Sequence, residues 1–597
     1  MKRINTLFIV LLAAICMTAI AKNEKKDEVK KNDAYAVARN LEIFSSIYKH
    51  LDMMYVDTLD ADVTVGEAID AMLRSLDPYT EYYPPEEVKN LKTMLTGKYA
   101  GIGALIKHNM KTDRVIVDEP YENMPAATAG LKKGDIILAI DDSVMVGKTV
   151  SYVSSHLRGE PGTTFKLTVK RPTPTYALTN PAADKKKKKK NEKSKYNDDT
   201  EGEILNFKIT RQAIQMPCVP YYGMLKTPDS LQSNEKIGYL MLSQFTDNCA
   251  RDVRRALVEM RQQGMTSLVF DLRGNGGGSL SEAIKIVNMF VPKGVTLVTT
   301  KGKIKRSNRE YKTDSEPLDT IMPIVVLVNG NTASASEITS GSLQDLDRAV
   351  IMGTRTFGKG LVQQPVELPH DASLKVTVSK YHIPSGRCIQ AINYRHTGGG
   401  YRENIADSLT HVFKTRNGRI VHDGGGIKPD ITVKPDSLPN IAAYLCQGGL
   451  DSTEVALYYV TDYIASHPTI APADEFRLTD AEYADFKQRV IDAGFKYDRE
   501  TNKLYDELVQ MAKFEGYYDD AKTEFDALKA KLKHNLTREL DNNRAIISHM
   551  LEQSIVSAYY YQKGGIMCTF DYDPQVQEAV KLLNDSEKYN FILNVKE

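Results

Sequence analysis

Residues 324–363 read IVVLVNGNTASASEITSGSLQDLDRAVIMGTRTFGKGLVQ, and this stretch decides the fold. The continuous apolar run Ile324–Val328 predicts a strand that is buried on both faces. A turn of small residues follows, and we then expect a helix over Ile338–Leu346 and a second strand over Ala349–Met352. The next turn presents Lys359 between two glycines. This order of elements predicts a largely parallel sheet, with functional side chains at the carboxyl ends of its strands.

Two side chains of this stretch have the chemistry of a nucleophile and its base. The hydroxyl of Ser334 follows the first strand, and Lys359 lies in the glycine turn. Lysine accepts a proton only when it is neutral, so burial must lower its pKa. Apolar neighbours of Lys359 permit that burial, and Gln363 can hydrogen-bond the amine and orient it. The alternative is a surface lysine in an ordinary glycine turn.

Two rival sites find little support in the same residues. The segment Gly353–Lys359 satisfies G-x-x-x-x-G-K, but Gly360 stands where a phosphate-binding loop needs Ser or Thr for Mg²⁺. A strand rather than a helix is expected next, so a phosphate would lack a helix N-terminus. A Ser-His-Asp triad would need a histidine near these turns, and the nearest, His370 and His382, lie outside glycine-rich turns. We expect no nucleotide, metal or other cofactor.

A second glycine-rich loop, Asp271-Leu-Arg-Gly-Asn-Gly-Gly-Gly278, lies between a predicted strand and a predicted helix. A dinucleotide fingerprint is excluded because Ser279 replaces its last glycine. Backbone N–H groups of such a loop can face a ligand, which suits an oxyanion hole. The alternative is a tight turn that binds nothing.

The pattern of alternating strands and helices begins near Lys236 and continues to about residue 381. Strands are expected over 237–242, 267–272 and 373–381, and helices over 249–262 and 280–289. Beyond about Leu438 the chain turns helical and polar, without a chemical motif, so we expect a structural or assembly domain over 439–597.

An earlier unit, 95–171, resembles a PDZ domain of the kind found in secreted proteases. Glycines open its first strand, and their bare backbone can aim N–H groups at the terminal carboxylate of a peptide. The following strand can pair with that peptide edge to edge, and alternation places apolar side chains on one face. The alternative is a plain glycine turn. The residues that we expect to bind substrate are Gly101, Ile102, Gly103, Ala104 and Ile106.

The N-terminal part predicts export. Residues 1–21 contain two basic residues, a short apolar run and Ala19-Ile20-Ala21, which together predict a cleaved signal peptide, with an uncleaved anchor as the alternative. A helical region is expected over 22–94, either as a small domain or as a dimer-forming face. The widely spaced cysteines after Cys16 are odd in number, which argues against a disulfide framework and a zinc site. We expect most of them in the core.

Charge gives little indication of a nucleic-acid partner. The net charge is +1, so no global field favours nucleic acid or an anionic membrane. Residues 172–202 include the unbroken run Lys185–Lys190, which predicts a solvated, disordered loop. Because the following run Ile204–Ile209 predicts a strand, this segment is either an insertion or a domain boundary.

The ordered set of motifs resembles the C-terminal processing, or tail-specific, serine proteases. It consists of Asn329…Thr332-Ala-Ser-Ala-Ser-Glu-Ile338, Leu343-Gln-Asp-Leu-Asp-Arg-Ala349, Thr356-Phe-Gly-Lys-Gly-Leu-Val-Gln363, Leu76-Asp-Pro-Tyr-Thr80, Tyr381-His-Ile-Pro-Ser-Gly-Arg387 and Gly425-Gly-Ile-Lys-Pro-Asp430. The resemblance implies a multidomain α+β protein. Its expected parts are a ClpP/crotonase-like α/β protease core over 203–438, a PDZ domain, and helical N- and C-terminal regions.

The resemblance also implies roles for single residues. Ser334 would be the nucleophile rather than Ser336, because Ser334 lies 25 residues before Lys359, the spacing of the family. Lys359 would be the general base and Gln363 its orienting partner. The N–H of Ala335 and that of a glycine within Gly276–Gly278, for which we take Gly277, would form the oxyanion hole. Two further residues receive structural roles: Glu337 would hold the turn in shape, and Arg158 would couple the PDZ unit to the protease.

The expected protein is therefore a periplasmic or secreted serine endopeptidase, with association with a cell-envelope membrane as a further option. Its PDZ domain would capture the apolar free C-termini of protein substrates. We expect no nucleic-acid partner and a homo-oligomer, a dimer in the first instance. An adaptor or regulator is a further candidate partner. The rival function is a catalytically dead PDZ scaffold, against which the joint presence of Ser334, Lys359 and Gln363 argues.

Overall fold

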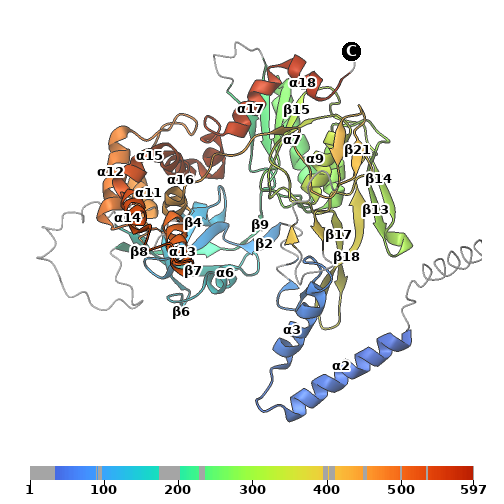
Figure 1. The fold of residues 1–597 in the computed structure, drawn as a ribbon, viewed down its shortest axis with the longest axis horizontal. Coiled ribbons are helices and arrows are strands. Elements are labelled where there is room, and N and C mark those ends of the chain that lie inside the picture. Colours follow the sequence, from blue (N-terminus) through green and yellow to red (C-terminus); the bar gives the residue numbers. More distant parts are fainter. Residues whose placement is uncertain are drawn as a thin grey trace, which may run out of the picture. The chain divides into compact units, whose positions relative to one another are not determined.

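The computed structural model describes residues 34–88, 91, 97–173, 202–226, 235–393, 401–402, 410–447, 453–497, 500–532 and 535–595 (Figure 1). The expected signal peptide, residues 1–21, and nearly all of the expected lysine-rich loop lie outside the described residues. The chain divides into two units, Met1–Leu76 and Asp77–Glu597.

Two helices make up the described part of the first unit, α2 (Ala34–Met54) and α3 (Ala61–Arg74). The side chain of Asp60 caps α3 by accepting a hydrogen bond from the N–H of Val63 at 3.1 Å. Helix α2 buries no residue. The apolar side chains that recur along it are exposed: Val37, Leu41, Phe44, Ile47 and Leu51.

A six-stranded sheet forms the PDZ-like part of the second unit. Its order is β3 (Ala104–Asn109), β4 (Arg114–Pro120), β5 (Ile136–Ile140), β7 (Thr164–Pro172) and β8 (Gly202–Thr210), with β6 (Ser143–Val144) paired to β5. Helices α5 (Pro125–Ala129) and α6 (Val150–Leu157) accompany it. Because β8 pairs with β7 along its whole length, residues 174–201 separate two strands of one sheet. The domain boundary that we expected at residue 203 therefore falls inside this sheet.

A second, largely parallel sheet lies at the centre of the part that we expect to be the protease core. Its order is β10 (Tyr221–Met224), β11 (Ile237–Met241), β12 (Ser267–Asp271), β15 (Ile324–Val328), β16 (Val350–Gly353) and β23 (Ile431–Thr432), and only β10 is antiparallel to its neighbour. Every residue of β15 is buried, as its continuous apolar run predicts. This buried sheet fixes where its strand ends, and hence the following turns, lie.

Helices cover both faces of the parallel sheet. Side chains of α7 (Cys249–Gln262), α8 (Leu280–Asn288) and α9 (Ala335–Asp345) share one apolar core with one face. The other face packs against α17 (Pro574–Leu583) and α18 (Ser586–Ile592) at the very end of the chain. Figure 1 shows these red helices beside the green strands. The last helices thus complete the core around the parallel sheet, although we expected them in a separate C-terminal domain.

A second set of strands forms an antiparallel sheet, β1 (Glu81–Tyr83), β18 (Ser373–His382), β13 (Thr296–Gly302) and β14 (Arg309–Lys312), with β17 (Leu361–Glu367) paired to β18. Strand β1 lies within the region 22–94 that we expected to be helical. Short pairs complete the strands: β2 (Lys98–Gly101) with β9 (Gln212–Gln215), β19 (Ile392–Asn393) with β20 (Tyr401–Arg402), and β21 (Val412–Lys414) with β22 (Ile420–His422). A 3₁₀ turn spans Lys305–Ser307.

The remaining helices are α10 (Asn440–Cys446), α11 (Val455–Ser466), α12 (Asp480–Asp492), α13 (Glu500–Phe514), α14 (Lys522–Lys531), α15 (Leu536–Asn542) and α16 (Arg544–Met567). Residues of α10, α11, α12, α15 and α16 share a separate apolar core. Helix α16 is interrupted at Tyr561, whose φ of 56° is not helical. Within the described ranges, no helix has the length and apolar character to cross a membrane.

Candidate active site

Ser334 lies at the turn between β15 and α9, in a strained backbone conformation. Its φ is 55° and its ψ is −115°, a region that residues with a side chain rarely adopt. Such strain costs about 1–3 kcal/mol and persists only when neighbouring contacts enforce it. One such contact is the hydrogen bond that the N–H of Ser334 donates to Oε2 of Glu337 at 2.9 Å.

Glu337 joins the serine turn to the lysine turn. Its carboxylate is fully buried and also accepts hydrogen bonds from the N–H groups of Lys359 at 2.8 Å and Gly358 at 2.7 Å. The hydroxyl of Thr356 donates a fourth bond at 2.6 Å. Burial raises the pKa of Glu337 to about 7, while these hydrogen bonds act in the opposite direction. One side chain therefore holds both turns in register, a wider role than the shape of a single turn.

Ser336, the rival hydroxyl, occupies a different environment. Its side chain is fully buried, and its hydroxyl donates to the backbone oxygen of Asn275 at 2.9 Å. Ser334 instead lines an open pocket. The two serines of this turn therefore differ in exposure: of the two, only Ser334 lines the pocket.

The pocket brings together the three residues that the sequence singles out. Ser334, Lys359 and Gln363 line one pocket of ≈ 620 Å³, together with the loop Gly276–Gly278. The Nε2 of Gln363 donates to the hydroxyl of Thr377 at 3.2 Å, a neighbour on β18. The amide of Gln363 is thus anchored to the sheet beneath the pocket.

Lys359 is partly buried and has a lowered pKa. Burial is the largest cause, and the positive charge of Lys375 adds to it, whereas Glu81, Glu337 and Asp77 act in the opposite direction. The aromatic ring of Tyr79 lies beside the ammonium group, 4.5 Å from Nζ to the ring centroid. Burial and Lys375 favour the neutral amine, the form that accepts a proton, whereas the face of the Tyr79 ring and the three carboxylates favour the ammonium.

Three residues of this environment were not anticipated as parts of the site. Tyr79 precedes β1, Lys375 lies on β18 and binds Glu81 at 2.5 Å, and the hydroxyl of Tyr381 donates to the backbone oxygen of Lys359 at 2.5 Å. Burial raises the pKa of Tyr79 to about 12. Tyr79 and Tyr381 stand in the quoted motifs Leu76–Thr80 and Tyr381–Arg387, which was the only signal in the sequence.

The glycine loop lies directly against the serine turn. A Cβ atom on Gly277 would lie 2.8 Å from the Cβ of Ser334 and 2.9 Å from the nitrogen of Ala335, so only glycine fits. The N–H of Gly277 donates to Oδ1 of Asn275 at 2.9 Å. In the described part of the chain, the N–H groups of Ala335, Gly276 and Gly278 donate to no protein acceptor. Gly277 therefore lets the glycine loop approach the serine turn closely, while its own N–H is already hydrogen-bonded to Asn275.

The PDZ-like residues divide between an open edge and the core. Strand β3 is the first strand of its sheet, so its outer backbone groups lack a strand partner among the described residues. Ala104 and Ile106 lie on this strand and are partly buried. Ile102 is buried within the PDZ core, although we expected it to line the peptide pocket. Gly103 adopts a φ of 69°, which favours glycine.

Arg158, at the end of α6, and Gly101, at the end of β2, both lie beside Tyr99. The guanidinium of Arg158 stacks over the ring of Tyr99, 5.2 Å from its centroid. A Cβ atom on Gly101 would meet that ring at 3.1 Å. Tyr99 lies on β2, so this contact of Arg158 is with the β2–β9 strand pair, and coupling to the protease stays a prediction.

Three parts of this chain match known protein families. The profile of "Peptidase family S41" matches residues 236–397, and that of "PDZ domain" matches residues 101–212. A third profile, "Probable PDZ-protease, C-terminal helical domain", matches residues 446–583. The first profile includes both proposed catalytic turns.

Similar proteins carry matching names. A carboxy-terminal-processing protease of Bartonella bacilliformis is 32% identical over 368 residues, which are 61% of this chain and 76% of the relative. A probable CtpA-like serine protease of Staphylococcus aureus is 30% identical over 438 residues, 70% of this chain and 77% of the relative. The solved photosystem II D1 C-terminal processing protease is 26% identical with a TM-score of 0.35, covering 66% of this chain and 88% of that chain. From the profiles and the two sequence relatives, the chain belongs to the carboxy-terminal-processing serine proteases of peptidase family S41.

Proposed function

We propose that Ser334 and Lys359 form a Ser-Lys dyad that cleaves peptide bonds. The observation that carries this proposal is the Glu337 carboxylate, which accepts the N–H groups of both residues and so holds their turns together. The lowered pKa of Lys359 supports its role as the base. We assign Gln363 the role of orienting the lysine, because both line the same pocket and its amide is held by a bond to Thr377.

The reaction proceeds in two halves. Neutral Lys359 takes the proton of the Ser334 hydroxyl as Oγ attacks the scissile carbonyl carbon. The lysine then gives that proton to the departing amine, which leaves an ester between substrate and Ser334. A water molecule, deprotonated by Lys359, attacks the ester and releases the acyl product.

The developing oxyanion needs donors about 3 Å away. We assign one of them to the N–H of Ala335, which follows the nucleophile. Gly277 supplies the second only if its N–H leaves Asn275, because that bond measures 2.9 Å. The N–H groups of Gly276 and Gly278, on either side, are the other candidates.

Substrates of this protease are proposed to be proteins with apolar free C-termini. Support comes from the open edge of β3 and the partly buried Ala104 and Ile106 on it, since an extended peptide binds by adding a strand. Further proposals are export to the periplasm or outside, a dimeric state, and an adaptor that delivers substrates. We also propose a ClpP/crotonase-like core, supported by the parallel sheet with helices on both faces.

The test is cleavage of a protein with an apolar tail by the wild type, Ser334→Ala and Lys359→Ala. Loss of the nucleophile or of the base should lower kcat/KM by at least about 10³-fold. Lys380→Ala is the matched control, since Lys380 is an exposed lysine on β18. If both dyad variants cleave as fast as the control, the dyad is wrong. Blocking the tail as an amide should slow cleavage, and an unchanged rate would contradict carboxylate capture.

A further inference from the structure

Tyr381 is a large side chain on strand β18 to which the proposed reaction gives no role. It is 1% exposed, and its backbone N–H donates to the oxygen of Gly360 at 3.0 Å. Its hydroxyl donates to the backbone oxygen of Lys359 at 2.5 Å and lies 3.2 Å from that of Ser334. One buried tyrosine therefore contacts the backbone of both proposed catalytic residues.

The hydroxyl of Tyr381 complements the carboxylate of Glu337. Glu337 accepts the N–H groups of the two proposed catalytic residues, whereas Tyr381 donates to their carbonyl oxygens. A hydroxyl carries one proton, so the shorter distance marks Lys359 as its main acceptor and Ser334 as the second one. The Ser334 oxygen also accepts the N–H of Ile338, the first bond of α9, at 2.9 Å. Both residues are thus held at the N–H and at the carbonyl oxygen.

The contact with Ser334 bears on the proposed oxyanion hole. The oxygen of Ser334 and the N–H of Ala335 belong to one peptide group, which is trans. A trans peptide is planar, and its C=O and N–H point in opposite directions, so the direction of one determines that of the other. Donors that hold the Ser334 oxygen therefore also set the direction of the Ala335 N–H, on a residue that lines the pocket.

The bond to Lys359 fixes a second peptide group in the same way. The N–H of Gly360, which shares that peptide with the Lys359 oxygen, donates to Oε1 of Gln390 at 2.7 Å. Burial, together with the negative charge of Glu337, raises the pKa of Tyr381 well above its ordinary value. The hydroxyl therefore keeps its proton and remains a donor.

We propose that Tyr381 is a positioning residue that joins the lysine turn to the peptide whose N–H stabilises the oxyanion. It acts through Lys359 and Ala335 rather than on the substrate. The ring of Tyr381 belongs to the apolar core beside the parallel sheet, so this task falls to the hydroxyl alone. The proposal rests on the proposed function, because it needs Ser334 as the nucleophile.

The test compares Tyr381→Phe with Tyr381→4-aminophenylalanine, which keeps an N–H donor at the end of the ring. Complete labelling of Ser334 with a fluorophosphonate counts the folded, reactive sites, and kcat is expressed per labelled site. We expect Tyr381→Phe to lower this kcat by about 10²-fold and to leave KM within about 2-fold of the wild type. The 4-aminophenylalanine variant should recover at least about 10-fold of that loss.

A transition-state analogue gives a second readout that a purely structural role would not change. A peptide boronic acid forms a tetrahedral adduct with the serine, and its oxygen occupies the oxyanion hole. Its affinity should fall in Tyr381→Phe by about the same factor as kcat, about 10²-fold, whereas the Kd of the corresponding uncleaved tail peptide should stay unchanged.

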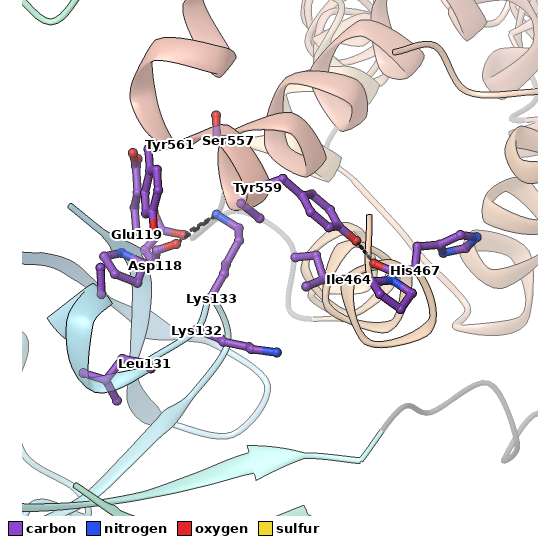
Figure 2. A pocket seen from close by; sticks show the side chains of 15 residues that line it. Asp118, Glu119, Leu131, Lys132, Lys133, Ile464, His467, Ser557, Tyr559 and Tyr561 are labelled. Carbon is purple, nitrogen blue, oxygen red and sulfur yellow. Dashed lines mark hydrogen bonds and ion pairs between the residues drawn. The ribbon is translucent and has the colours of Figure 1, made fainter. Parts of the chain in front are cut away.

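Two other tyrosines provide matched controls, because each donates its hydroxyl to a backbone oxygen outside the active-site pocket. Tyr483 donates to Leu540 at 2.7 Å in the helical core. Tyr559 donates to His467 at the wall of a separate pocket, as Figure 2 shows. Tyr483→Phe and Tyr559→Phe should lower the Tm at most and leave kcat per labelled site unchanged.

The outcomes separate this proposal from the dyad. An unchanged kcat per labelled site in Tyr381→Phe would overturn the proposal, and so would equal losses with and without the donor at the end of the ring. If Tyr381→Phe does not fold, 4-methylphenylalanine, which fills the space of the hydroxyl without a donor, replaces it under the same outcomes. Failure of the dyad has another signature: Ser334→Ala and Lys359→Ala would cleave as fast as the wild type.

Discussion

The proposed catalytic pocket and the proposed capture edge are built in opposite ways. Around Ser334, fixed hydrogen bonds hold the backbone: Glu337 accepts N–H groups of both turns and Asn275 accepts that of Gly277, so the few N–H groups left for a ligand are held in place. Along β3, one side of the strand carries no strand partner among the described residues. Chemistry needs donors and acceptors held in one arrangement, whereas capture of varied tails needs a backbone that is still free to pair.

Removing the carboxylate of Glu337 should disrupt the rigid arrangement around Ser334. Glu337→Ala leaves four donors unsatisfied in a fully buried place, so the turns should separate. We expect kcat/KM to fall by about 10³-fold, together with a lower Tm. The matched control is Glu482→Ala, which removes another helix-capping carboxylate, on α12. An active Glu337→Ala variant would show that the serine turn and the lysine turn keep their positions without this carboxylate.

The same carboxyl group should make stability depend on pH. Burial raises its pKa to about 7 from 4.5, so the folded state binds its proton more tightly than the unfolded state. Its stabilising contribution is complete below pH 4.5 and is lost as the pH rises through about 7. Between these limits we expect a loss of about 3 kcal/mol in the free energy of unfolding that Glu337→Gln does not show. Urea unfolding of both proteins at several pH values measures this difference, and parallel curves would refute it.

A methyl group on Gly277 should push the glycine loop from the serine turn. Gly277→Ala places its Cβ 2.8 Å from that of Ser334, and we expect about 10²-fold lower kcat with a smaller change in KM. Gly274→Ala is the matched control. Gly274 also has a positive φ, of 72°, but a Cβ there meets nothing within 4 Å. Equal losses in both variants would mean that backbone strain, rather than contact with Ser334, is responsible.

A change on the capture edge should have a smaller and more selective effect. Ile106 faces the partly buried side of β3, so Ile106→Ala should raise KM for apolar-tailed substrates by about 10-fold. Cleavage of an amidated substrate should change little. Leu105→Ala is the control, since Leu105 points to the opposite face and is 47% exposed. If both variants raise KM alike, the Ile106 face of β3 does not select the tail of the substrate.

Local pattern was sufficient to predict most elements of the catalytic stretch. Ile324–Val328 is a buried strand as expected, and the α9 helix begins three residues earlier than the expected Ile338. The sequence did not predict this earlier start because the small residues after Ser334 show no helical periodicity of apolar side chains. The helix nevertheless begins there, capped by the side chain of Glu337 in its first turn. Helix α7 matches its expected bounds because apolar residues recur along one face.

Contacts between distant segments could not be predicted in this way. Tyr79 lies beside Lys359 because β1 pairs with β18, and nothing local in Leu76–Thr80 indicates that pairing. The same limit explains β8, which returns to the PDZ sheet after a segment that looks like a boundary. It also explains α17, whose apolar face predicts burial without saying which sheet it covers.

The most direct test of the dyad is covalent labelling of the serine turn with a fluorophosphonate, followed by peptide mass spectrometry. Our account predicts an adduct on Ser334 and none on the buried Ser336. The labelling rate should rise with pH along a single titration below the ordinary lysine value of 10.5, as Lys359 loses its proton. It should fall by at least about 10²-fold in Lys359→Ala. An adduct on Ser336, or unchanged labelling of Lys359→Ala, would contradict the account.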